Sequence, residues 1–305
     1  MRPAAFLRPA LLAAALLPLA ACDDSTTAES GAALSAPTLD ALALLPPGAQ
    51  TVAMIDVQEA ERAGALGDAL SQMERAGGEA QARFDDFERK TGFVPERDLD
   101  RVYFAVTEDD PVFVVRARMD RDRLVAFLDE QPEMTRAAYR DLPLFTAEEQ
   151  HGERFAIALL NNDLALAGAE SDVRAAADRA LDGGPSAATD AAFTRTLDRA
   201  RHGEAWIVSR SVMGRNAPFE VASGVLSMDF DPDGIDVAAV AEPTSGASSK
   251  DLADAIEGAI ALARVQNDDP DAREMLDGVR VRTRGELVEV RGAISSDQIQ
   301  RIHAH

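Results

Sequence analysis

Residues 225–241 read VLSMDFDPDGIDVAAVA, and this stretch decides what kind of sheet the chain builds. Apolar and β-branched residues stand on both sides of the segment DPDG at 231–234. Pro, Asp and Gly in that order are typical of a tight turn. The pattern therefore predicts a hairpin with strands over 225–230 and 235–241. A hairpin joins antiparallel strands, because parallel neighbours need a longer crossover connection.

An earlier stretch has the same arrangement. Residues 101–106 and 112–119 each carry alternating apolar side chains, and the acidic segment 108–111 separates them. This alternation predicts a second hairpin. A helix is expected after each hairpin, with Asp120 as the N-cap of the first and Ser249 just before the second.

A second correspondence lies further along the chain. LALAGAESDV at 164–173 and LVEVRGAISS at 287–296 both read as a strand, a Gly-Ala pair, a Ser cap and a helix. Two such correspondences more than 100 residues apart predict a duplicated domain and not a solenoid array.

The remaining segments complete an α+β fold with two similar halves. We expect each half to be a mostly antiparallel sheet with helices packed on one face. The other strands are expected at 51–57, 138–145, 154–160, 164–167, 205–208, 279–283 and 287–290, and helices at 60–76, 79–91, after Ser171 and at 191–200. The expected domains are a signal peptide at 1–21, a flexible tether at 22–40, a first copy at 41–188 and a second copy at 189–305.

The N-terminus has the three parts of an export signal. Arg2 and Arg8 give it positive charge, an apolar run covers 11–19, and small residues precede Cys22. The segment LAAC at 19–22 resembles the lipobox of bacterial lipoproteins. That resemblance implies cleavage before Cys22 and acylation of its sulfur and its new amino group. The alternative is an ordinary cleaved signal that leaves Cys22 as a free thiol.

The cysteine count favours the lipoprotein interpretation. Cys22 is the only cysteine of the chain, so it has no disulfide partner within it. Asp23 follows directly, and in some Gram-negative lipoproteins Asp at this position favours retention at the inner membrane. The resemblance therefore implies a protein of the cell envelope, anchored by lipid and facing the periplasm, with Asp23 favouring the inner over the outer membrane.

Composition excludes some classes of partner. The chain has 31 Lys and Arg against 53 Asp and Glu, a net charge of −22. Such a surface repels nucleic acid, so no nucleic-acid partner is expected. The folded body begins after LPPG at 45–48 and broadly resembles the duplicated α/β envelope lipoproteins of unknown function. That resemblance assigns no activity.

The acidic turn of the opening hairpin is also a candidate metal site. Asp229, Asp231 and Asp233 have the spacing of the first ligands of a calcium loop. An EF-hand loop needs a bidentate acid at its twelfth position, which here is Val240. A hairpin turn explains the same residues, so we expect no metal there.

No other segment has a catalytic pattern. His151 and His202 stand in His-Gly-Glu triplets, but no zinc motif, nucleophile elbow or phosphate-binding glycine loop occurs. We therefore expect no cofactor and a non-enzymatic role, either structural or in binding a protein or an apolar ligand. Two alternatives remain open: an envelope hydrolase with dispersed catalytic carboxylates, and a periplasmic carrier of lipids or other apolar ligands.

Overall fold

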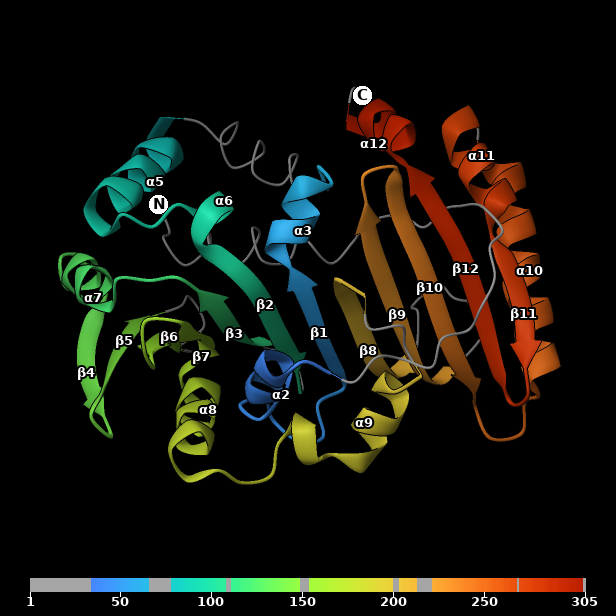
Figure 1. Cartoon of the computed structure of the whole chain (residues 1–305). Helices are drawn as coiled ribbons and strands as arrows, with labels where there is room; N and C mark the ends of the chain where they lie inside the picture. The colour runs from blue at the N-terminus through green and yellow to red at the C-terminus, as the bar shows by residue number, and fades with distance from the viewer. Residues whose placement is uncertain are drawn as a thin grey trace. The chain divides into compact units, whose positions relative to one another are not determined.

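A computed structural model of the chain describes residues 34–65, 78–107, 111–148, 154–199, 203–212, 221–267 and 269–303. Cys22, Asp23, His151 and His202 lie outside these residues. The chain divides into two compact units (Figure 1). The first comprises Ala36–Ala49 and Ile55–Asp190, and the second comprises Gln50–Met54 and Ala191–His305. Strand β1 (Thr51–Asp56) is thus divided between the units.

The first unit is an antiparallel sheet with helices. Its strands follow one another in the order β2-β3-β7-β6-β5-β4. The strands are β2 (Leu99–Val106), β3 (Pro111–Ala117), β4 (Thr135–Tyr139), β5 (Leu142–Glu148), β6 (Arg154–Leu159) and β7 (Leu164–Ala169). The helices are α2 (Ala36–Leu42), α3 (Val57–Arg62), α5 (Gly78–Thr91), α6 (Pro95–Asp98), α7 (Arg121–Asp129), α8 (Glu170–Asp182) and the short 3₁₀ helix η2 (Ala187–Thr189).

Both faces of this sheet carry buried side chains. On one face, Val102 and Phe113 pack against Val57 of α3. On the other face, the hydroxyl of Tyr103 hydrogen bonds that of Thr38 in α2 at 3.1 Å. Successive strand residues point to opposite faces, so α2 and α3 lie on opposite sides of β2. Helices therefore contact both faces of this sheet, where the sequence led us to expect them on one.

The second unit repeats the antiparallel construction. Its strands follow the order β8-β9-β10-β12-β11. They are β8 (Ala205–Val212), β9 (Val221–Asp231), β10 (Gly234–Pro243), β11 (Arg280–Arg284) and β12 (Leu287–Ser295). The helices are α9 (Ala191–Leu197), α10 (Ser249–Gln266), α11 (Pro270–Gly278) and α12 (Ser296–His303).

The second sheet is also packed on two sides. Val288 of β12 belongs to a buried cluster with Leu252 of α10. Trp206 of β8 is 1% exposed, and its ring centre lies 6.4 Å from that of Phe193 in α9. None of the described helices combines the length and apolar content needed to span a membrane.

The two units share one strand order. In each, the second strand of a hairpin (β3 of β2-β3, or β10 of β9-β10) has another partner on its other side. That partner comes later in the chain, after at least one intervening strand. Thus β7 pairs with β3, and β12 pairs with β10. β6 lies outside β7, and β11 lies outside β12. The first unit adds β5 and β4 beyond β6. This common order matches the correspondences found in the sequence.

The hairpin at 225–241 is confirmed. Asp231 lies opposite Gly234, so Pro232 and Asp233 form a two-residue connection between β9 and β10. The strands continue beyond the predicted bounds at both ends.

Two local predictions were wrong. The single strand expected at 138–145 is a hairpin of β4 and β5, in which Arg140 and Asp141 take positive φ angles of 50° and 68°. Asp141 is a common type of turn residue but Arg140 is not, and apolar side chains flank the pair on both sides. Ser171, expected to cap α8, lies inside that helix, which starts at Glu170 after Ala169.

Gly234 provides a sharp test of the second unit. Its φ is +150°, and a Cβ added there would lie 2.0 Å from the carbonyl oxygen of Ile294 in β12. Gly234→Ala is expected to lower the free energy of unfolding by about 2–4 kcal/mol, because β10 and β12 must separate. Chemical denaturation measures the loss.

The matched control is Gly258→Ala. Gly258 lies within α10 with no atom within 4 Å of an added Cβ, so alanine there should stabilise by about 0.5–1 kcal/mol. Equal stability of the two variants would contradict the observed β10–β12 pairing.

Candidate functional site

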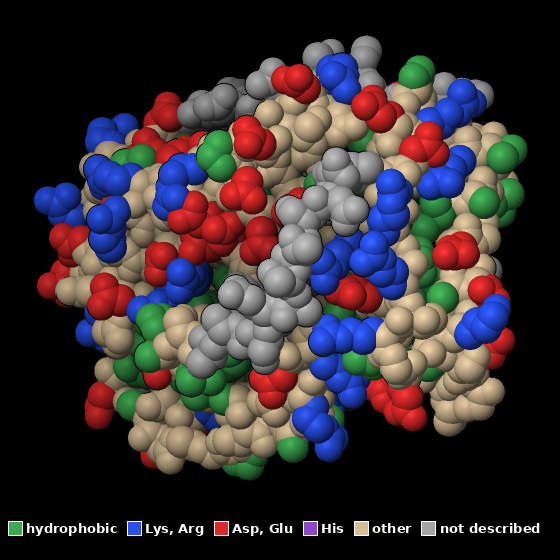
Figure 2. All heavy atoms as spheres, turned by 45° about the vertical axis from the view of Figure 1, so that its right-hand side comes forward, with side chains coloured by type: hydrophobic (Ala, Val, Ile, Leu, Met, Phe, Trp, Pro, Cys, Tyr) green, Lys and Arg blue, Asp and Glu red, His purple; other side chains and the backbone are tan. Residues whose placement is uncertain are grey.

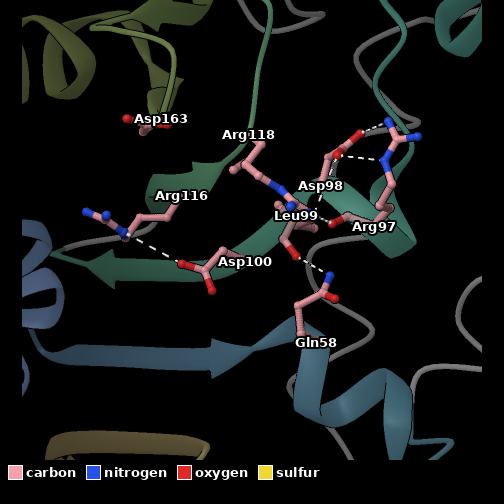
Figure 3. Close-up of a pocket in the computed structure, with 9 residues that line it drawn as sticks. Gln58, Arg97, Asp98, Leu99, Asp100, Arg116, Arg118 and Asp163 are labelled. Carbon is pink, nitrogen blue, oxygen red and sulfur yellow. Dashed lines mark hydrogen bonds and ion pairs between the residues drawn. The ribbon is translucent and has the colours of Figure 1, made fainter.

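A hollow of about 280 Å³ lies in the first unit where α6 meets the start of β2 and the end of β3 (Figure 3). The loop between β6 and β7 contributes its remaining side. The charged side chains that line it are Arg97, Asp98, Asp100, Arg116, Arg118 and Asp163. Three cations and three carboxylates thus share one small volume.

Asp98 is the most enclosed of these charged groups, at 8% side-chain exposure. Its carboxylate accepts hydrogen bonds from the backbone N–H of Val94 at 2.9 Å and from Nε of Arg97 at 2.9 Å. The Arg97 guanidinium holds the pKa of Asp98 below its usual range, and the Val94 N–H acts in the same direction. Asp98 is therefore a carboxylate fixed in its ionised form.

Backbone hydrogen bonds hold the walls together. The N–H of Arg118 donates to the carbonyl of Asp98 at 2.8 Å, and that of Ala117 donates to the carbonyl of Asp163 at 3.1 Å. The side-chain amide of Gln58 in α3 donates to the carbonyls of Glu96 and Leu99. These bonds tie α3, α6, β3 and the β6–β7 loop to one point.

The side chains of Arg116 and Asp100 are less tightly bound by their neighbours than that of Asp98. The β2–β3 register shifts between Leu99 and Arg101, which leaves Asp100 without a partner residue across the pair. Nε of Arg116 lies 3.9 Å from Asp100 Oδ2, beyond hydrogen-bonding distance, and this buried Nε has no hydrogen-bond partner among the described residues. Figure 3 shows Arg116 and Asp100 side by side on the two strands. This pair is open to a polar group placed between them.

The guanidinium of Arg118 lies nearer the rim. Its Nη2 donates to the carbonyl of Arg97 and lies 3.8 Å from Asp98, while 72% of the side chain remains exposed. The hollow as a whole suits a small ligand that carries both signs of charge, or a charged side chain of another protein. Its charged lining does not suit an apolar ligand.

The residues predicted from the sequence lie elsewhere. Asp229, Asp231 and Asp233 are in the β9–β10 hairpin, where Asp229 lies opposite Asp236 and Val240 lies opposite Val225. Within the described ranges, no three His, Cys, Asp or Glu side chains come together as a metal site would require. Cys22, the predicted lipidation residue, is outside the described residues.

The sequence did not predict the hollow, because each of the charged residues that line it is unexceptional when considered alone. Arg97-Asp98 precedes one strand and Arg116 to Arg118 ends the next. A hairpin brings the start of its first strand beside the end of its second, so these charges were predictable neighbours. The strand shift at Asp100 and the approach of Asp163 could not be read from this pattern.

The fold of the chain is similar to folds already seen in crystal structures. The solved structures that it matches include two crystal structures, titled "Structure of crystal form III of TP0453" and "Structure of crystal form I of TP0453". The first has a TM-score of 0.54 and the second 0.51, both at 9% sequence identity. The matches cover 86% and 87% of this chain, and 97% and 96% of the other.

At that identity the likeness concerns the fold alone, an α+β arrangement of antiparallel sheets and helices. No protein-family model and no curated protein sequence matches the chain. These comparisons assign no chemistry to the hollow.

Asp98 is expected to be structural, and its contribution should depend on pH. Because its pKa is lowered in the folded protein, its ionised form stabilises the fold above the unfolded pKa of about 3.9. That stabilisation is lost as pH falls through the folded pKa. Asp98→Asn should cost about 1–3 kcal/mol at pH 7, and the difference from wild type should shrink below about pH 4.

Denaturation at several pH values measures this effect. The matched control is Asp100→Asn, whose carboxylate is 49% exposed and should change stability by less than about 0.5 kcal/mol. A cost for Asp98→Asn that stays constant down to pH 3 would contradict the assigned role of the Asp98 charge.

Proposed function

We propose that the chain is a cell-envelope lipoprotein, anchored through Cys22 and facing the periplasm, that acts by binding and not by catalysis. The observation that carries the anchor is the segment LAAC at 19–22, placed directly after a short apolar run. Two or more acyl chains give stable membrane attachment, whereas one chain binds only marginally. Asp23 favours retention at the inner membrane.

The charged hollow supports a binding role for the folded body. A general acid needs a carboxyl group whose pKa is raised toward the working pH. Asp98 has the opposite shift, because Arg97 stabilises its ionised form. Among the described carboxylates, burial raises the pKa of Glu88, which lies in α5 and does not line the hollow. The hydrolase alternative therefore gains no support from this site.

The hollow also bears on the carrier alternative. A carrier of lipids or other apolar ligands needs a cavity of roughly 300 Å³ or more with apolar walls. The hollow is of similar size, but arginine and aspartate side chains form most of its lining. A polar ligand, or a charged group on a partner protein, is a better match to these walls.

The anchor has a direct test. Cys22→Ser in the full chain should abolish incorporation of a labelled fatty acid and move the protein from the membrane fraction to the soluble fraction. The sulfur that accepts the acyl chain is absent from this variant. Ser25→Ala, three residues further on, is the matched control and should keep both properties.

Mass spectrometry of the mature N-terminus separates the two interpretations of the signal. An acylated cysteine at the first position is expected. An unmodified Cys22 thiol in a processed, soluble protein would establish the ordinary cleaved signal instead, and membrane association retained by Cys22→Ser would also overturn the anchor.

A further inference from the structure

Strand β11 ends the strand order of the second unit, so one of its edges has no strand partner among the described residues. Its sequence is RVRTR over Arg280–Arg284. Alternation places Arg280, Arg282 and Arg284 on the same face of the strand, and all three side chains are exposed. An open backbone edge and a row of three guanidinium groups therefore coincide.

These arginines are little used within the chain. Arg282 and Arg284 form no ion pair with the residues that the structure describes, and Arg280 donates to the backbone carbonyl of Asp277 at 2.8 Å. On the same face of β12, Arg291 lies opposite Arg280 and Glu289 lies opposite Arg282, and Arg291 and Glu289 form an ion pair with each other. Figure 2 shows Lys and Arg side chains close to Asp and Glu side chains on the side of the molecule that it displays.

The charge of this strand contrasts with that of the chain. The whole protein carries −22, whereas β11 contains three cations and no anion. Like charges placed side by side are costly. Of the five β12 residues that pair with β11, Glu289 is the one carboxylate, and it already forms an ion pair with Arg291. The row is therefore complementary to an acidic partner.

In the first unit, the strand that corresponds to β11 has a further strand paired along its outer edge. There β6 occupies the place in the strand order that β11 occupies in the second unit. The outer edge of β6 is paired by β5, an antiparallel strand, over five residue pairs. In that pairing the acidic residue Glu148 lies opposite Arg154. The corresponding edge of β11 lacks such a strand within the described part of the chain.

We propose that the free edge of β11 binds an extended acidic segment of a partner protein, which adds a strand to the sheet. Backbone hydrogen bonds to the edge would supply affinity, and carboxylates at alternate positions would face Arg280, Arg282 and Arg284. This inference goes beyond the proposed anchor and does not depend on acylation of Cys22.

Charged side chains on edge strands also serve to prevent pairing between sheets, so the test must separate the two roles. The probe is a fluorescent nine-residue peptide in which Glu alternates with Val and Thr. Its control has the same sequence with alternate backbone nitrogens methylated, which keeps the charges and removes the donors needed for strand pairing. Binding to the full chain in detergent is followed by fluorescence anisotropy.

The test variant replaces Arg280, Arg282 and Arg284 with Gln. It should bind the alternating peptide at least tenfold more weakly than the unaltered chain, with an unchanged circular dichroism spectrum. The methylated peptide should bind at least tenfold more weakly to the unaltered chain.

A matched variant controls for net charge. It replaces Arg62, Arg89 and Arg123 with Gln, three exposed arginines of the first unit at 65%, 69% and 61% side-chain exposure. It has the same total charge as the β11 variant and should bind the peptide as the unaltered chain does.

Several outcomes would overturn the proposal. Equal binding of the methylated peptide would reduce the site to charge attraction without strand addition. Equal loss in the two arginine variants would assign binding to net charge. Failure to bind the peptide, combined with β11-dependent binding to phosphatidylglycerol vesicles, would identify a lipid surface. Failure combined with β11-dependent self-association would identify an interface between copies.

Discussion

Burial on both faces is the constraint on which each sheet of this protein depends. A strand covered on one side needs apolar residues only at alternate positions, whereas a strand covered on both sides needs them at successive positions. β3 meets that need, since Val112, Phe113 and Val114 are consecutive and all buried. A buried hydroxyl without a hydrogen bond would destabilise the fold, and the hydroxyl of Tyr103 avoids this cost by hydrogen bonding Thr38.

This constraint explains how far the sequence predicted the fold. The antiparallel class, the hairpin at 225–241 and the common order of the two halves follow from turn residues and strand patterns, which are local signals. The covering of both faces depends on where α2 and α9 return to the sheet, and that is a tertiary property. The β4–β5 hairpin was missed because Arg140 and Asp141 adopt a conformation usually given to Gly or Asn. Here the surrounding strands override local preference.

The candidate site depends on another kind of information. Arg97, Asp98 and Arg118 could be predicted as neighbours from the hairpin alone, because its two ends meet. The sequence could not predict whether each charged group has a partner within hydrogen-bonding distance, since that depends on distances of a few tenths of an ångström. Asp98 binds Arg97 directly, whereas Asp100 and Arg116 remain 3.9 Å apart. The first pair stabilises the wall of the hollow, and the second leaves polar atoms available.

In each unit one strand pair, β3–β7 or β10–β12, joins strands that are not consecutive along the chain. These pairs set an order in which the chain can complete its structure. The pairs β2–β3, β5–β6, β9–β10 and β11–β12 join strands that are consecutive along the chain, so each can form as soon as its second strand is available. The β10–β12 pair is different, because α10, α11 and β11 all intervene. For a chain delivered N-terminus first, the second edge of β10 stays open until Leu287–Ser295 arrives. β12 is therefore the strand that completes this sheet, because it covers the second edge of β10 and is the partner of β11. Without β12, the edge of β10 would stay unpaired and prone to aggregation.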